Sequence, residues 1–82
     1  MIITRIVYYC TYTRNPDEVP RFSAPFTTAH EARGEAKLLA GASYWGAIEK
    51  HYEFKQDDVN DDGWHVDWER AGETAIEIID SF

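Results

Sequence analysis

The first thirteen residues restrict the fold more than any other part of the chain. Residues 2–13 (IITRIVYYCTYT) are dominated by β-branched and aromatic side chains. Such residues favour extended strands, in which successive side chains point to opposite faces of a sheet. Ile6, Tyr8 and Cys10 therefore share one face, and Val7 and Tyr9 share the other. This pattern predicts a long, central β-strand.

The stretch after this strand is rich in turn-forming residues. Asn15 to Glu18 (NPDE) has the composition of a turn, and Pro20 and Pro25 follow it. Proline has no backbone N–H group to donate to a neighbouring strand, so it is confined to sheet edges and irregular chain. We expect an irregular or edge segment up to Phe26.

A helix is predicted from Thr28 to about residue 40. Thr28 and Glu31 have the spacing of a capping box, in which each side chain bonds a backbone amide of the other. Gly41 supplies a typical helix end. Small side chains let a helix lie close to a sheet, and the helical face with apolar periodicity is mostly alanine: Ala29, Ala32, Ala36 and Leu39.

The chain beyond the helix alternates between apolar and polar residues. This alternation predicts strands over residues 46–56, 64–69 and 74–79, arranged as a meander. Trp68, Ala71, Ala75 and Ile78 also fit helical spacing, so the alternative of a helix in the last segment stays open. The predicted fold class is α+β, with one α-helix at about 28–40 packed on a mostly antiparallel sheet of three to four strands in the order β-α-β-β-β.

Length and cysteine content limit the class of protein. A chain of 82 residues forms one domain, 1–82. Cys10 is its only cysteine, which excludes an intramolecular disulfide and a four-thiolate zinc site and favours a reducing compartment. Its place in a strongly β segment predicts a buried packing thiol. No stretch approaches the ~20 apolar residues of a membrane span, so we expect a cytoplasmic protein without a membrane partner.

Charge is unevenly distributed along the chain. Residues 1–52 hold five acids and six bases, a net charge of +1, whereas residues 53–82 hold ten acids and two bases, a net charge of −8. A surface of this sign repels nucleic acids and attracts basic proteins. We therefore expect the partner to be the basic surface of a host protein or nucleoprotein complex, bound by a monomer or homodimer, with no direct contact to nucleic acid.

Alternation assigns several of these acids to one outward sheet face, flanked by an acidic loop. Neighbouring strands lie ~4.8 Å apart, so such carboxylates would be spaced in a way comparable to the phosphates of a duplex. The same surface also has a simpler interpretation as a solvated face that keeps the protein soluble. The predicted partner-binding residues are Glu49, Glu53, Asp57, Asp58, Asp61, Asp62, Trp64, Asp67, Glu69 and Glu77.

Residues 58–69 (DVNDDGWHVDWE) resemble an EF-hand calcium loop. Carboxylate or amide oxygens stand at positions one, three and five, a glycine at six and a glutamate at twelve. The candidate ligands are Asp58, Asn60, Asp62 and Glu69, and the motif requires a helix on each side. The alternative is a hairpin loop that ends in the turn dipeptide Asp62-Gly63.

Other chemistry is not indicated by the sequence. His65 and Asp67 would share a strand face and could meet His51 at a metal, but exposed strand histidines are far commoner than metal ligands. The chain has no glycine-rich phosphate loop and no nucleophile elbow. We expect no enzymatic activity and no cofactor.

The size, the acidity and the order of elements resemble small phage or mobile-element inhibitor proteins of the anti-CRISPR kind. The resemblance covers the whole chain. It implies an inhibitor that binds a host defence complex stoichiometrically and blocks its nucleic-acid site by occupying basic residues. A calcium-binding module and a small structural or assembly protein are the alternatives.

Overall fold

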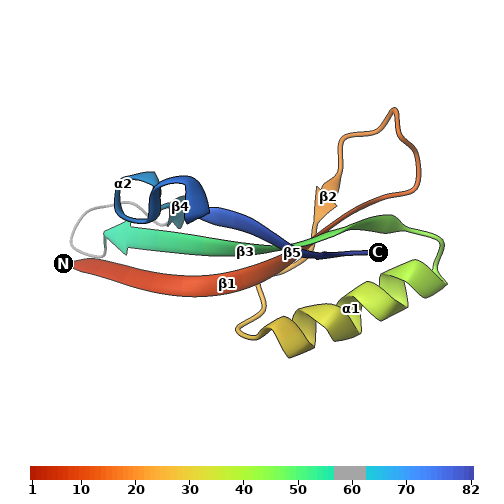
Figure 1. Cartoon of the computed structure of the whole chain (residues 1–82), viewed down its shortest axis with the longest axis horizontal. Helices are drawn as coiled ribbons and strands as arrows, with labels where there is room; N and C mark the ends of the chain where they lie inside the picture. The colour runs from red at the N-terminus through yellow and green to blue at the C-terminus, as the bar shows by residue number, and fades with distance from the viewer. Residues whose placement is uncertain (57–62) are drawn as a thin grey trace.

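The frame of the molecule is a pair of long antiparallel strands. The computed structural model describes residues 1–56 and 63–82. β1 (Ile2–Thr13) and β3 (Trp45–Gln56) pair along their whole length, from Ile2 opposite Gln56 to Thr13 opposite Trp45 (Figure 1). The long N-terminal strand predicted from its β-branched and aromatic residues is confirmed.

Short segments complete the sheet on both sides of this pair. β2 (Arg21–Phe22) pairs with the C-terminal half of β1, and the proline-rich stretch around it is irregular, as predicted. β4 (His65–Val66) and β5 (Ile76–Ser81) both pair with the other edge of β3. The result is a five-stranded sheet in the order β2-β1-β3-β4, with β5 also on β3.

β4 and β5 pair with the same edge of β3, and one β3 residue, Tyr52, separates the two pairings. The backbone N–H of Asp67 donates to the carbonyl of Tyr52, and the N–H of Tyr52 donates to the carbonyl of Ala75, both at 2.9 Å. Between these two bonds the chain forms α2 (Trp68–Ala71) and the 3-10 turn η1 (Gly72–Thr74). We call residues 67–75 the excursion.

The first helix covers one end of one sheet face. α1 (Ala29–Gly41) begins at the predicted capping box, since the Thr28 hydroxyl accepts a hydrogen bond from the Glu31 amide at 3.2 Å and donates to the Glu31 carboxylate at 3.0 Å. Its alanine-rich face packs on Cys10 and Ile48, and the buried core consists of Cys10, Ala32, Ala36, Leu39 and Ile48. The Cys10 thiol donates to the Ala32 carbonyl at 3.2 Å, so helix and sheet approach closely.

The α+β prediction is confirmed, but two details of it are wrong. The strand expected over 64–69 is limited to His65–Val66, because Asp67 accepts a hydrogen bond from the Arg70 amide and starts a helical turn. The three-strand meander is also wrong, because β5 returns to β3 instead of pairing with β4. Gly72 assists this return with a positive φ of 58°, a conformation that glycine adopts without steric cost.

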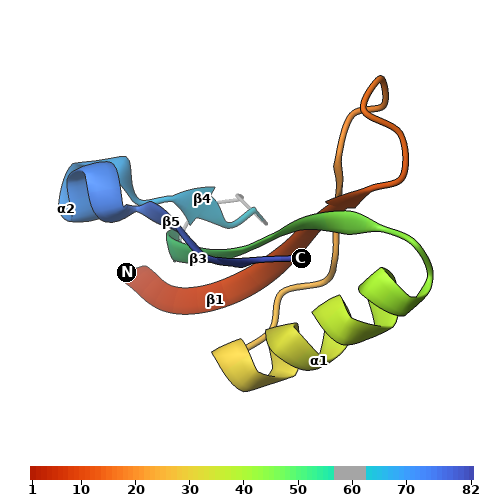
Figure 2. The ribbon, with the colours of Figure 1, turned by 45° about the vertical axis from the view of Figure 1, so that its right-hand side comes forward.

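The molecule is elongated, with extents of 42 × 24 × 21 Å. α1 lies toward one end of the long axis and α2 lies near the other, beside the N-terminus (Figure 2). In the part of the chain that the structure describes, neither helix is long and apolar enough to cross a membrane.

Candidate functional site

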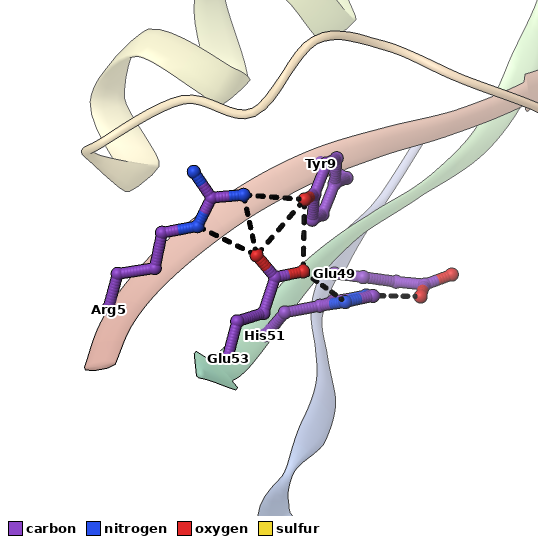
Figure 3. A network of polar contacts seen from close by, with 5 residues as sticks. All are labelled: Arg5, Tyr9, Glu49, His51 and Glu53. Carbon is purple, nitrogen blue, oxygen red and sulfur yellow. Dashed lines mark hydrogen bonds and ion pairs between the residues drawn. The ribbon is translucent and has the colours of Figure 1, made fainter. Parts of the chain in front are cut away.

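A network of polar side chains lies on the sheet face opposite α1. Cys10 and Ile48 point toward the helix, so the odd-numbered residues of β1 and β3 point away from it. Figure 3 shows the five members, of which Arg5 faces Glu53, Tyr9 faces Glu49, and His51 lies between the two glutamates on β3.

Glu53 is the centre of this network. Its carboxylate accepts hydrogen bonds from Nε of Arg5 at 2.8 Å and from the Tyr9 hydroxyl at 3.0 Å, and forms an ion pair with Nη2 of Arg5 at 2.7 Å. Only 5% of Glu53 is exposed, and a charge so buried is stable only when it is paired. Burial, followed by the hydrogen bond to Glu53, raises the pKa of Tyr9, and the nearby Arg5 opposes this shift in part.

His51 lies between two carboxylates. Its Nε2 is 3.0 Å from Oε1 of Glu49, whereas its Nδ1 is 3.6 Å from Oε2 of Glu53, which is too long for a hydrogen bond. The ring packs edge-on against Tyr9 with a centroid separation of 4.7 Å, and only 6% of the residue is exposed. Nδ1 therefore has no hydrogen-bond partner among the described residues.

Aromatic rings shield the network from water. The guanidinium of Arg5 stacks at 4.0 Å from the centroid of the Trp64 ring, and Phe22 meets Tyr9 edge-on at 5.9 Å. The contacts of Glu53 with Arg5 and Tyr9 join β3 to β1, the His51–Glu49 contact lies within β3, and the bond from Arg5 to the Tyr9 hydroxyl at 3.4 Å lies within β1. We interpret the network as a structural device that fixes the register of the two strands, since a buried ion pair specifies one pairing more than it adds stability.

The structure separates the acids that were expected on one outward face. Glu53 is buried against Arg5, Asp67 caps α2, and Glu77 lies opposite Lys50 on the other face of the sheet. A single acidic lattice of Glu49, Glu53, Asp67, Glu69 and Glu77 is therefore wrong. Asp57, Asp58, Asp61 and Asp62 lie outside the described residues.

The flanks of the predicted calcium loop also differ from an EF-hand. The chain enters the loop from strand β3, where a helix was expected, and α2 after it has only four residues. Asp58, Asn60 and Asp62 lie outside the described residues, and Glu69 is exposed on α2. In residues 1–56 and 63–82, no group of three His, Cys, Asp or Glu side chains is arranged to hold a metal ion.

Sequence reasoning missed two members of the network and expected a third, the buried Glu53, on an outward face. Arg5 and Tyr9 were not selected, although Arg5 is the only charged residue in an otherwise apolar and polar-uncharged strand. That isolation was the available signal, because a lone charge in a central strand needs a partner on the next strand. Trp64, expected at the edge of a partner-binding face, is half-buried and stacks on Arg5.

Among the described residues of the acidic half, the excursion carries two exposed acids, Glu69 and Glu73, whereas a third, Asp80, lies on β5. Asp67, Glu69 and Glu73 lie on it with a single base, Arg70, and Trp68 is 58% exposed. A groove of about 800 Å³ lies beside it. The groove is lined by Gln56, Arg70 and a set of apolar and acidic side chains. These apolar and acidic side chains are Ile2, Phe54, Val66, Trp68, Asp67 and Glu69.

No protein-family model, curated protein or solved structure matches the chain.

Proposed function

We propose that the protein is a small inhibitor that binds a basic, nucleic-acid-binding surface of a host defence complex. The contact surface in this proposal is the acidic end, which we define as Asp67, Trp68, Glu69 and Glu73 of the excursion. The observation that carries the proposal is a groove at one end of the molecule in which the exposed Trp68 lies beside two acids, Asp67 and Glu69.

Charge polarity along the molecule supports this choice of surface. On α1 the charges cancel, because two acids, Glu31 and Glu35, alternate with two bases, Arg33 and Lys37. The excursion has a net charge of −2 and lies toward the opposite end of the long axis. A polar distribution of this kind orients a molecule as it approaches a basic surface and increases the association rate.

The groove beside α2 suits a lysine or arginine side chain of the partner. Phe54 and Trp68 offer apolar surface to the aliphatic stem of such a side chain, and an aromatic face also attracts its cationic head. Asp67 and Glu69 line the same groove and complement the charge. A basic residue held in this way is no longer accessible to a nucleic-acid phosphate, which is how binding would lead to inhibition.

The binding surface is tested with an oligo-arginine peptide as the probe. Reversal of two charges at the acidic end, Glu69→Lys with Glu73→Lys, is expected to weaken binding about tenfold at low salt, because rim charges govern salt-dependent attraction. The matched control is Asp17→Lys with Glu18→Lys in the exposed turn after β1, which changes the net charge by the same amount. Equal losses in both variants would contradict a localised surface.

Inhibition is tested separately with nucleic acid. Addition of the protein to a purified host defence complex that holds a fluorescent duplex is expected to displace the duplex. The acidic-end variant should fail to displace it, and the turn variant should succeed. If a complex binds the protein without losing its duplex, or if no defence complex binds it, the inhibitor proposal is wrong even where the peptide result stands.

A further inference from the structure

The outer edge of β1 is paired along only half of its length. In the C-terminal half, Thr11 and Tyr12 pair with β2, and Tyr8 exchanges two hydrogen bonds of 2.8 Å with Phe26. From Ile2 to Ile6, none of the strands in residues 1–56 and 63–82 pairs with this edge. Within the described residues, the N-terminal half of β1 is therefore an edge of the sheet.

The backbone groups at this edge are directed toward a further strand. The N–H and carbonyl of Tyr8 point away from β3, because both bond to Phe26. Backbone groups alternate in direction along a strand, so those of Ile6, Thr4 and Ile2 point the same way. Three consecutive positions for antiparallel hydrogen bonds are thus available.

This edge lacks the features by which proteins prevent strand pairing. Edge strands are normally protected by lysine, proline or a bulge, and residues 2–6 contain none of these. Ile2, Ile3 and Ile6 are 60%, 38% and 45% exposed. The one charge in the segment, on Arg5, is bonded to Glu53 on the neighbouring strand.

We propose that a second copy of this chain pairs antiparallel with Ile2–Ile6 and forms a homodimer with a continuous sheet. The two-fold axis passes beside Thr4, so Thr4 faces Thr4 of the partner subunit, and Ile2 faces Ile6 of the partner subunit. In this register the outward backbone groups of Ile2, Thr4 and Ile6 all form hydrogen bonds with the partner subunit. Registers shifted toward Tyr8 conflict with the bonds between Tyr8 and Phe26.

A second copy fits this edge because the edge is self-complementary. Ile2 and Ile6 lie on the same sheet face, so each apolar side chain meets the other across the axis. Residues 1–13 contain no acid, so none of the acids that give the protein its net charge of −7 lies in the contact strand. Five strand spacings of ~4.8 Å separate the two copies of β4, a distance of about 24 Å that exceeds the Debye length at physiological salt.

Sedimentation velocity over a range of concentrations tests the dimer. The wild-type protein and Thr4→Val are expected to sediment as dimers, because valine keeps the backbone N–H. Thr4→Pro removes that outward N–H and leaves the bonds between β1 and β3 intact, so it is expected to be a monomer with an unchanged circular dichroism spectrum. A wild-type protein that is monomeric up to millimolar concentration would overturn the proposal.

Introduced cysteines test the register and do not depend on the proline variant. Thr4→Cys is expected to form a disulfide-linked dimer under mild oxidation, because the two Thr4 positions face each other. In this register two Ile6 positions are about 14 Å apart along the strands, too far for a disulfide, so Ile6→Cys alone should remain unlinked. A mixture of Ile2→Cys and Ile6→Cys should form a linked heterodimer. Linking of Ile6→Cys as rapid as that of Thr4→Cys would overturn the register.

Discussion

Arg5 and Glu53 stand directly opposite each other on β1 and β3, and Oε1 of Glu53 accepts a hydrogen bond from Nε of Arg5 at 2.8 Å and pairs with its Nη2 at 2.7 Å. The two residues are 48 positions apart in the sequence. Their pairing therefore depends on the register of the long strands and also reports on it.

Removal of one partner of this ion pair should destabilise the fold strongly. Arg5→Met leaves the Glu53 carboxylate buried without its cation, and the expected loss is about 3 kcal/mol in the free energy of unfolding. Urea denaturation followed by tryptophan fluorescence measures this loss. The double variant Arg5→Met with Glu53→Met should be less destabilised than the sum of the two single variants, and additive losses would show that the two side chains are not coupled.

The close approach of β1 and β3 at Gly46 makes this position intolerant of any side chain. A Cβ atom there would overlap the Thr11 carbonyl oxygen and lie 2.7 Å from its carbon. Gly46→Ala should therefore lower the free energy of unfolding by about 3 kcal/mol. Gly34→Ala is the matched control, because nothing lies within 4 Å of its Cβ position in the middle of α1. It should increase stability by about 0.5–1 kcal/mol.

The Cys10 thiol should be unreactive in the folded protein. It is fully buried, burial raises the pKa of the Cys10 thiol, and the nearby Glu35 carboxylate raises it further. The thiolate is the reactive form, so modification by an aromatic disulfide reagent should be rapid in urea and very slow in native buffer. Asp17→Cys, in the exposed turn after β1, provides the exposed comparison in the same fold. Rapid labelling of Cys10 in native buffer would contradict its packing against Ala32.

Stability should fall as the pH rises above about 10, the ordinary pKa of tyrosine. The pKa of Tyr9 is raised in the folded protein by burial and by Glu53. Above pH 10 the folded state therefore binds more protons than the unfolded state, and the free energy of unfolding decreases with pH. The contribution of Tyr9 to the free energy of unfolding is fully present below pH 10. It is lost as the pH rises from 10 to the raised pKa of Tyr9 in the folded protein. Thermal melts of wild type and Tyr9→Phe measure it, and the variant should show a shallower decline; identical slopes would contradict it.

The sequence predicted the local structure of α1 and β1 better than the pairing of the strands. Thr28 and Glu31 form the capping box within four residues, so no distant contact was needed to recognise it. The excursion was missed because residues 68–78 satisfy both helical and strand periodicity. Hydrogen bonds of Asp67 and Ala75 to Tyr52 determine which structure this segment adopts. These contacts are distant in sequence, so a local residue pattern does not predict them.

The same limit explains the errors in the candidate site. Alternation correctly placed Glu49 and Glu53 on one face of β3. Whether that face is exposed depends on what lies across it, and Arg5, Trp64 and Phe22 come from three distant segments. The face of a strand on which a residue lies therefore does not determine whether that residue is exposed. Glu53 is buried because these three side chains cover it.

The excursion begins and ends at Tyr52, because Asp67 bonds to its carbonyl and Ala75 to its amide. A segment whose two ends meet at one residue of a sheet can change in length and sequence without shifting the register of any strand. The excursion can therefore be replaced while the paired strands β1 and β3 stay the same. A loop of different length can be grafted between Asp67 and Ala75 without disturbing the pairing of β1 with β3.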